Sequence, residues 1–352
     1  MQKSKGLIIG CGAIAREHLA ALSDLENVQV AAVCDLSAVR AEATAERFGI
    51  GKWGLDYQSL IDDVRPDLVH ITTPPTSHFS IAKNCLAAGC NLLCEKPITQ
   101  SYEEFGILKG LAIENDRLLL ENQNYRFHSS ILKIRDLINA GELGEIVDVQ
   151  IFLSLNIAAA GSPYVDPNAS YFGQALRGGL IGDFLTHIAY LSHIFTGSAI
   201  DLRTVWMKQR SESPWPADEF RGFIKGERAP AYVAFSGNAQ PDGFVIRVSG
   251  TKMHAEANLF EPPRLALRRV RSGEPALAKL IDGVTESSQV FKGTVAAFWK
   301  KLGGASSYDG MSEMIGATYR ALENRDAVPI SLEEIDEISR LVDRFSKTEL
   351  KL

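Results

Sequence analysis

Residues 6–15 read Gly-Leu-Ile-Ile-Gly-Cys-Gly-Ala-Ile-Ala, and this stretch decides the fold at the start of the chain. Its apolar half predicts a short buried strand, and a helix over residues 13–23 is expected to follow. Between them lie two glycines and a small residue in the spacing Gly10-x-Gly12-x-x-Ala15. Gly10 permits a tight turn, Gly12 lets the backbone approach a pyrophosphate, and Ala15 lets the helix pack closely on the sheet.

The start of the predicted helix supplies the other half of a phosphate site. Its first N–H groups, at Gly12, Ala13 and Ile14, have no partner within the helix and lie at the positive end of its dipole. We therefore expect a dinucleotide cofactor at this turn. A glycine turn without any ligand would contain the same residues, and this alternative stays open on the motif alone.

Asp35 closes the next predicted strand, roughly twenty residues after the glycine turn, as in dinucleotide-binding folds. A carboxylate there accepts hydrogen bonds from the 2′-hydroxyl of the ribose and repels a 2′-phosphate, which favours NAD over NADP. Ser37 and Arg40 follow closely, and an arginine near this position can pair with the phosphate. We predict NAD as the cofactor, and NADP stays possible.

The first 124 residues alternate apolar strands with amphipathic helices, a pattern typical of a parallel sheet covered on both faces. The predicted strands are residues 6–10, 28–34, 67–72, 91–94 and 117–121, and the predicted helices include residues 13–23, 77–88 and 102–114. The sequence therefore predicts an α/β chain that begins with a doubly wound Rossmann domain over residues 1–124.

After residue 124 the pattern changes to longer, β-rich and often alternating segments. The predicted strands are residues 146–155, 202–207, 232–235, 244–249, 253–257 and 265–270, with helices at residues 131–140, 180–195 and 331–347. Alternation is typical of an antiparallel sheet with one face on the core. We predict an α+β domain over residues 125–352 with a large, open, mainly antiparallel sheet. The last helix is a candidate to pack back on the first domain.

Composition excludes some classes of protein. A formal net charge of −6 argues against nucleic-acid binding, because neutralising phosphates requires clustered Lys and Arg. The first apolar run is too short for a signal-peptide core or a membrane span, so we expect a cytoplasmic protein without a membrane partner. The five cysteines form no CxxC pair, and no metal site is predicted.

Four further motifs follow the glycine turn along the chain. They are Thr73-Pro74-Pro75-Thr76-Ser77-His78, Cys94-Glu95-Lys96-Pro97, Asn124-Tyr125-Arg126-Phe127, and Gly178-Gly179 ahead of Asp183 and His187. In this order the chain resembles the glucose–fructose oxidoreductase, inositol dehydrogenase and rhizopine-catabolism family (Gfo/Idh/MocA). The resemblance implies a Rossmann domain, an open-faced sheet domain, and NAD(P)-dependent oxidation or reduction of a sugar, cyclitol or sugar derivative. It also implies a homodimer or homotetramer assembled through that sheet.

The resemblance also implies roles for single residues. Those expected to line the cofactor site, besides the glycine turn and the residues near Asp35, are Thr73, Pro75, His78, Glu95, Lys96 and Asn124. The catalytic positions of the family fall on Lys96, Asp183 and His187.

These three residues suit the chemistry that the resemblance implies. Hydride transfer from a carbinol leaves a hydroxyl proton, and histidine titrates near physiological pH, so His187 is the predicted general acid/base. Asp183 precedes it by one helical turn and would fix the imidazole or hold a substrate hydroxyl. Lys96 would stabilise negative charge on the reacting oxygen. An ordinary amphipathic helix with a solvated polar face would show the same pattern over residues 180–195.

Several other residues are candidates for the substrate pocket. Besides Lys96, Asp183 and His187 we predict Arg126, Tyr190 and Tyr308, with Tyr164 and Trp206 as weaker candidates for which packing is an equal reading. Tyr190 stands three residues after His187, where the family often carries an aspartate. We interpret His18, His70, His193 and His254 as packing or surface residues and leave His128 undecided.

Two other functions compete with a simple dehydrogenase. One is an enzyme that keeps its cofactor bound and uses it to oxidise and then reduce within one cycle. The other is a nicotinamide- or sugar-sensing regulatory protein of the same fold that has lost catalysis. The presence of Lys96, Asp183 and His187 together argues against the sensor, which has no need for all three.

Overall fold

A computed structural model of the chain describes residues 3–157, 162, 164, 173, 176–211, 213, 215–260, 264–269, 281, 283–284, 287–295, 299, 308–324 and 327–347. The chain divides into two compact units. Unit 1 consists of Met1–Asn124 and Gly310–Arg340, and unit 2 of Tyr125–Asp309 and Leu341–Leu352. Each unit has its own sheet.

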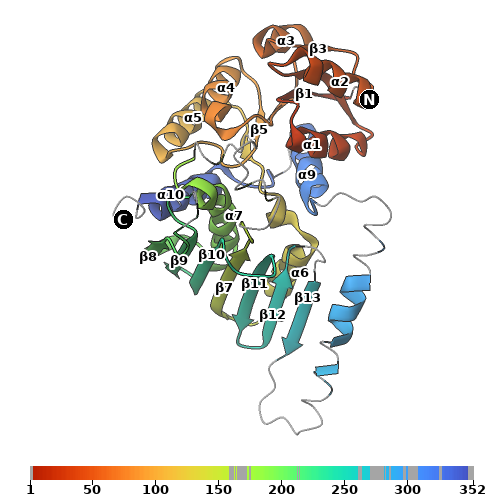
Figure 1. Ribbon diagram of the computed structural model, residues 1–352. Helices are drawn as coiled ribbons and strands as arrows, with labels where there is room; N and C mark the ends of the chain where they lie inside the picture. Colours follow the sequence, from red (N-terminus) through yellow and green to blue (C-terminus); the bar gives the residue numbers. More distant parts are fainter. Residues whose placement is uncertain are drawn as a thin grey trace. The chain divides into compact units, whose positions relative to one another are not determined.

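The sheet of unit 1 has six parallel strands in the order β3-β2-β1-β4-β5-β6 (Figure 1). The strands are β1 (Ser4–Ile9), β2 (Val28–Cys34), β3 (Trp53–Gly54), β4 (Leu68–Ile71), β5 (Leu92–Cys94) and β6 (Leu119–Glu121). The prediction of a doubly wound parallel sheet is confirmed. Strands β1 to β3 are added toward one edge of the sheet, and strands β4 to β6 toward the other edge. The carboxyl ends of β1 and β4, where the order reverses, form the switch point at which such sheets bind ligands.

Helices connect the strands of unit 1. They are α1 (Ala13–Ser23), α2 (Ala38–Phe48), α3 (Tyr57–Val64), α4 (Pro75–Ala87) and α5 (Tyr102–Glu114). Right-handed crossovers on either side of the switch point place α1 and α2 on one face and α4 and α5 on the other. Strand β3 and helix α3 were not predicted, because both are too short to show a clear period.

Two later helices complete unit 1. Helix α9 (Met311–Asn324) packs on α1, and its Tyr319 is buried. Helix α10 (Leu332–Lys347) begins as predicted at Ser331, whose hydroxyl accepts the Glu334 N–H at 3.1 Å. Within unit 1, the carboxylate of Asp336 on α10 accepts a hydrogen bond from the hydroxyl of Tyr102 on α5 at 3.0 Å. Helix α9 was not predicted from the sequence.

The sheet of unit 2 has seven strands in the order β13-β12-β11-β7-β10-β9-β8. They are β7 (Ile146–Ser154), β8 (Ala199–Met207), β9 (Glu219–Gly226), β10 (Pro230–Ser236), β11 (Gly243–Gly250), β12 (Met253–Asn258) and β13 (Arg264–Arg269). Among the pairings of these described strands only that of β10 with β7 is parallel, so the predicted mainly antiparallel sheet is confirmed. Strand β9 was not predicted, and Val270 of the last predicted strand lies outside the described residues.

One face of the unit 2 sheet is covered by helices. Helix α7 (Gly179–Thr196) packs on β7, β9 and β10, while α6 (Ser129–Asn139) lies against β12 (Figure 1). Two glycines form the start of α7, Gly178 as its N-cap and Gly179 as its first residue. Both have positive φ angles, +82° at Gly178 and +57° at Gly179. A side chain at either position would meet the ring of Trp206 or Trp215, so the tight entry to α7 requires glycine.

Three further properties concern the described part of the chain. No described helix combines the length and apolarity needed to cross a bilayer. No cluster of three or more His, Cys, Asp or Glu among these residues is arranged to hold a metal. All five cysteines fall within the described residues, are buried and form no disulfide. Burial raises the pKa of the Cys11 thiol to about 11, which keeps it protonated.

Candidate cofactor and catalytic sites

The glycine turn lies at the switch point of the unit 1 sheet, after β1. Gly10 has a φ of +98°, and an added Cβ would lie 2.8 Å from the backbone nitrogen of Thr73. The Thr72 hydroxyl, after β4, donates to the Gly10 carbonyl at 2.8 Å. Gly10 is therefore required both by its backbone conformation and by the close approach of the two loops.

Gly12 has a different environment. It is the N-cap of α1, makes no side-chain cap, and a Cβ added there would meet no atom within 4 Å. The next two residues of the predicted phosphate site, Ala13 and Ile14, form the first turn of the helix, with Ala13 exposed and Ile14 half-buried. An open space in front of uncapped helical N–H groups fits the pyrophosphate of NAD.

Asp35 immediately follows β2, where the ribose of the cofactor is expected. Its Oδ2 accepts the N–H of Cys11 at 2.9 Å, and its Oδ1 accepts the N–H of Ser37 at 2.8 Å and the Nε–H of Arg40 at 3.2 Å. The Ser37 hydroxyl caps α2. The structure thus brings Asp35, Ser37 and Arg40 together beside the glycine turn, with the carboxylate at the centre of the group.

The loop after β4 is held by a buried histidine. The Nε2 of His78 lies 2.8 Å from the carbonyl oxygen of Thr73, and its Nδ1 lies 2.8 Å from that of Pro97. The Thr73 hydroxyl accepts from Ser77 at 2.8 Å, and Pro75 is the buried first residue of α4. Burial lowers the pKa of His78. A neutral imidazole carries one N–H, so His78 donates to one of these two carbonyls and packs against the other, between the two loops.

In the Glu95-Lys96 motif after β5, the two side chains differ in burial. The Glu95 side chain is buried, with Oε1 2.9 Å from Nε2 of His18 and Oε2 accepting the N–H of Lys96 at 3.2 Å. Lys96 itself is half-buried. Asn124, also predicted to line the cofactor site, is buried at the start of the short 3₁₀ helix Asn124–Phe127.

A second group of predicted residues lies on α7 in unit 2. Asp183 and His187 are each 6% exposed, one helical turn apart. The Nδ1 of His187 lies 2.8 Å from the hydroxyl of Tyr190, and that hydroxyl accepts the N–H of Tyr125 at 3.3 Å. Tyr190, predicted to touch substrate, is fully buried, and its hydroxyl contacts the imidazole.

Aromatic rings enclose His187 on several sides. The ring centroid of Tyr125 lies 5.0 Å away in an edge contact, that of Tyr190 5.5 Å away, and that of Phe184 6.3 Å away. Burial raises the pKa of the Tyr125 hydroxyl above its ordinary value. The sequence reasoning missed Tyr125, although it stands beside the predicted Arg126.

Tyr164 and Tyr308 lie in the same electrostatic environment as Asp183. Burial raises the pKa of Tyr164 to about 12, and the charges of Asp183, Tyr308 and Asp242 add to this effect. Tyr308 is 40% exposed. Both tyrosines therefore stay predictions for the substrate pocket.

Three further candidates are buried. The Nε1–H of Trp206 donates to the carbonyl of Phe345 at 3.1 Å, and Trp206 is 1% exposed. The Nδ1 of His128 accepts the N–H of Ser130 and caps α6, so this residue acts at a helix end. Arg126 is buried in the 3₁₀ helix.

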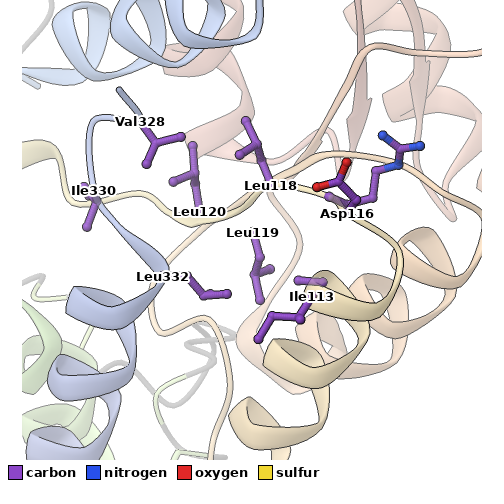
Figure 2. A pocket seen from close by; sticks show the side chains of 10 residues that line it. Ile113, Asp116, Leu118, Leu119, Leu120, Val328, Ile330 and Leu332 are labelled. Carbon is purple, nitrogen blue, oxygen red and sulfur yellow. The ribbon is translucent and has the colours of Figure 1, made fainter. Parts of the chain in front are cut away.

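A groove of about 340 Å³ in unit 1, lined by apolar side chains together with Asp116 and Arg117, contains none of the predicted residues (Figure 2). It is lined by Leu118, Leu119 and Leu120 at edge strand β6, by Ile113 of α5, and by the segment 328–332. Its wall lacks the glycine turn and the polar groups of Asp35 and Lys96. The residues predicted to bind the cofactor thus lie at the switch point and not in this groove.

Comparison with protein families decides the classification. A family profile described as an oxidoreductase family with an NAD-binding Rossmann fold matches residues 5–123, and the profile of the Gfo/Idh/MocA C-terminal domain matches residues 131–256. The chain belongs to the Gfo/Idh/MocA family. The resemblance stated from the motifs is confirmed, as is an NAD-binding Rossmann domain.

Several known proteins of related sequence are sugar dehydrogenases by name. The chain is 27% identical to the glucose-6-phosphate 3-dehydrogenase of Bacillus subtilis over 79% of its length and 77% of that protein. It is 25% identical to the D-apiose dehydrogenase of Paraburkholderia graminis over 50% of its length, which spans 47% of that protein. An Agrobacterium radiobacter oxidoreductase solved with NAD+, L-tartaric acid and magnesium has the same fold, with a TM-score of 0.79, 18% identity, and coverage of 99% and 97% of the two chains.

Proposed function

We propose that this Gfo/Idh/MocA chain is an NAD-dependent dehydrogenase or reductase. Its substrate is a hydroxyl or carbonyl group of a sugar, cyclitol or sugar derivative. The observation that carries the proposal is the 2.8 Å contact between Nδ1 of His187 and the Tyr190 hydroxyl inside an aromatic enclosure. An imidazole held at one nitrogen is oriented for proton exchange at the other. The sugar substrates in the names of the relatives support the substrate class.

The residues divide the chemistry as follows. NAD, when bound, would supply the hydride acceptor for oxidation of the carbinol carbon, and its reduced form would supply the hydride donor for the reverse reaction. Nε2 of His187 takes the hydroxyl proton in oxidation and returns it in reduction, while Tyr190 holds the ring through Nδ1. Lys96 donates to the reacting oxygen and stabilises its developing negative charge. Asp183 accepts a hydrogen bond from a second substrate hydroxyl.

The cofactor would be held by unit 1. Gly12 and the first turn of α1 bind the pyrophosphate, and Asp35 accepts hydrogen bonds from the ribose hydroxyls. Arg40 already donates to the Asp35 carboxylate, so a 2′-phosphate would have to displace it from an anion that also repels the phosphate. This arrangement supports NAD over NADP.

The open face of the unit 2 sheet supports a homodimer or homotetramer. Phe223 and Tyr232 lie directly opposite each other on β9 and β10 and are 51% and 45% exposed. Val205, on the same face of neighbouring β8, is also exposed. An apolar patch of this kind favours a partner surface, and a second copy of the chain is our proposal. The buried, unpaired cysteines are consistent with a cytoplasmic location.

A cofactor-reduction assay tests the proposed function. The protein is incubated with NAD or NADP and a panel of inositols, aldoses and sugar acids, and the absorbance of the reduced nicotinamide is followed. We expect turnover of at least one sugar or cyclitol with NAD, and loss of that turnover in His187→Ala. A protein that binds NAD in calorimetry but converts no member of the panel would contradict this substrate class and favour the sensor.

A further inference from the structure

Four polar side chains form a hydrogen-bonded chain through the core of unit 1. Oε1 of Glu95 lies 2.9 Å from Nε2 of His18, and Nδ1 of His18 lies 3.0 Å from Nδ1 of His70. Nε2 of His70 lies 3.0 Å from the hydroxyl of Tyr319. Both histidines are fully buried, and Tyr319 is 1% exposed. The four residues come from α1, β4, the turn after β5, and α9.

The positions of the hydrogens follow from the groups themselves. An ionised Glu95 accepts, so His18 carries its hydrogen on Nε2 and accepts at Nδ1. His70 must then donate from Nδ1 and accept at Nε2 from the Tyr319 hydroxyl. In this arrangement both imidazoles are neutral and every hydrogen bond of the chain is made. Burial lowers the pKa of His70 well below its ordinary value, which agrees with a neutral ring.

Glu95 is the charged end of the chain. Burial raises the pKa of its carboxyl, but hydrogen bonds from His18 and Asn122 outweigh burial, and the pKa lies below its ordinary value. The neighbouring carboxyl of Glu121, on β6, has its pKa raised by burial and by the charge of Glu95. The cation of Lys96 favours the ionised form of both carboxyls.

Asn122 also donates to Oε1 of Glu95, and two further titratable groups face the chain. Asp67 lies near enough to Tyr319 to raise its pKa further, and burial raises the pKa of Cys94, beside Glu95, well above its ordinary value. The Cys94 thiol and the Tyr319 phenol therefore stay protonated and uncharged. The imidazole that hydrogen-bonds to Glu95 is that of His18.

A core that needed only to be filled would not contain these groups. A buried polar network costs desolvation and is stabilising only when every member is satisfied. Here the network ends at a functional position, because the second oxygen of Glu95 accepts the backbone N–H of Lys96 at 3.2 Å. The hydrogen-bonded chain of side chains therefore reaches the turn that carries Lys96, the residue proposed to stabilise the reacting oxygen.

We propose that His18, His70 and Tyr319 are positioning residues, which hold the Glu95 carboxylate against the backbone N–H of Lys96 and thereby fix the Lys96 turn for the reaction. Their effect on turnover rests on the proposed function. The arrangement of hydrogens and the hold on Lys96 are properties of unit 1 that can be measured without substrate.

Nuclear magnetic resonance tests the arrangement directly. In the full-length protein, nitrogen shifts of the imidazoles should show His18 protonated at Nε2 and His70 at Nδ1. In His18→Leu the Glu95 carboxyl, assigned through Glu95→Gln, should titrate about one to two pH units higher, because a charge-assisted hydrogen bond is lost. The Lys96 amide resonance should shift with it. His70 protonated at Nε2, or an unchanged Glu95 titration, would overturn the proposal.

Kinetics separate positioning from packing. His18→Leu should lower kcat by roughly tenfold or more with the Kd for NAD within about threefold, and should move the acid limb of kcat to higher pH. His18→Gln retains an N–H that reaches Glu95, so it should restore most of kcat and the wild-type limb. The matched pair His254→Leu and His254→Gln in unit 2 controls for the loss of an imidazole. If kcat fell equally in both His18 variants and the acid limb of kcat did not move, the four residues would have a packing role only. Absence of turnover in the wild type would count against the proposed function, and the resonance measurements would still decide the chain.

Discussion

The hydroxyl of Tyr190 lies 2.8 Å from Nδ1 of His187 and also accepts the backbone N–H of Tyr125. The imidazole is therefore oriented by a phenol that is itself held by the backbone. A phenol fixes the ring, as a carboxylate would, but it places no full negative charge beside the imidazole. This contact links a departure from the family pattern to a definite geometric role.

Removing this hydroxyl should impair turnover without affecting the cofactor. In Tyr190→Phe, Nδ1 of His187 loses a partner in a buried site, which costs about 1–3 kcal/mol and corresponds to a fall in kcat of roughly 10- to 100-fold. Steady-state kinetics with saturating NAD would measure it. Tyr232→Phe removes an exposed hydroxyl from the same unit and should leave kcat unchanged. Equal rates for Tyr190→Phe and wild type would show that the contact does not orient the catalytic ring.

The proposed acid/base and electrophile should each dominate turnover. His187→Asn and Lys96→Met should lower kcat by about 10²- to 10⁴-fold, the usual range for general acid–base groups. The Kd for NAD, measured by calorimetry, should change by less than about threefold for His187→Asn, because this residue belongs to unit 2. Near-normal turnover in both variants would remove the proposed mechanism.

The two glycines of the turn should separate folding from binding. In Gly10→Ala the new Cβ lies 2.8 Å from the Thr73 backbone at a φ of +98°, so we expect destabilisation by about 2 kcal/mol or more. Gly12→Ala meets no atom within 4 Å, so its melting temperature should stay close to that of wild type. Its Kd for NAD should nevertheless rise by roughly tenfold, because the methyl group enters the space assigned to the pyrophosphate. A Gly12→Ala protein with unchanged NAD affinity would place the cofactor elsewhere.

Asp35 should decide between the two nicotinamide cofactors. Asp35→Ser removes the anion that repels a 2′-phosphate and releases Arg40 to pair with one, so the ratio of kcat/KM for NAD over NADP should fall by roughly tenfold or more. The variant also loses the acceptor of the Cys11 and Ser37 N–H groups, and its stability must be measured alongside. Asp56→Ser, which alters an N-cap in the same unit, is the matched control and should leave the ratio unchanged.

Acid should destabilise unit 1 through its buried histidines. Burial lowers the pKa of His78 and lowers that of His70 well below its ordinary value, so the folded chain takes up these protons only below the unfolded pKa of about 6.5. Their contribution is complete above about pH 6.5 and is lost on acidification, at up to about 1.4 kcal/mol per pH unit for each histidine. Glu121, whose pKa is raised, opposes part of this loss at lower pH.

Urea unfolding between about pH 7.5 and pH 5.5 measures this slope. His78→Gln should remove close to half of it, whatever its effect on stability at neutral pH. A His254→Gln variant should keep the wild-type slope. A free energy of unfolding that does not change over this range would contradict the neutral state of the buried imidazoles.

Much of the fold was predictable because its elements are long or strongly patterned. The apolar strands of the first domain and the alternating strands of the second match the observed sheets closely. The missed elements have physical reasons. Strand β3 has two residues, and β9 carries Gly222 and exposed charges that weaken an alternating pattern. Helix α9 belongs to unit 1 through contacts that no local pattern reveals.

The sequence could name candidate site residues, but it could not predict where their side chains point. The sequence singled out Glu95, His78 and Tyr190, but it could not show that all three side chains face buried hydrogen-bond partners. His70 carried a usable signal, because an ionisable residue inside the apolar run Leu68–Ile71 needs a partner. That partner is Tyr319, far along the chain, and only the folded structure shows it.

The closing of unit 1 by α9 has a consequence for how the protein is made. Tyr319 and Met314 fill the core beside α1 and β4, but the ribosome releases residues 1–124 long before it reaches residue 310. We expect the N-terminal part of unit 1 to expose apolar surface beside α1 until α9 has been synthesised. Unit 1 should therefore complete its core only after most of unit 2 has emerged.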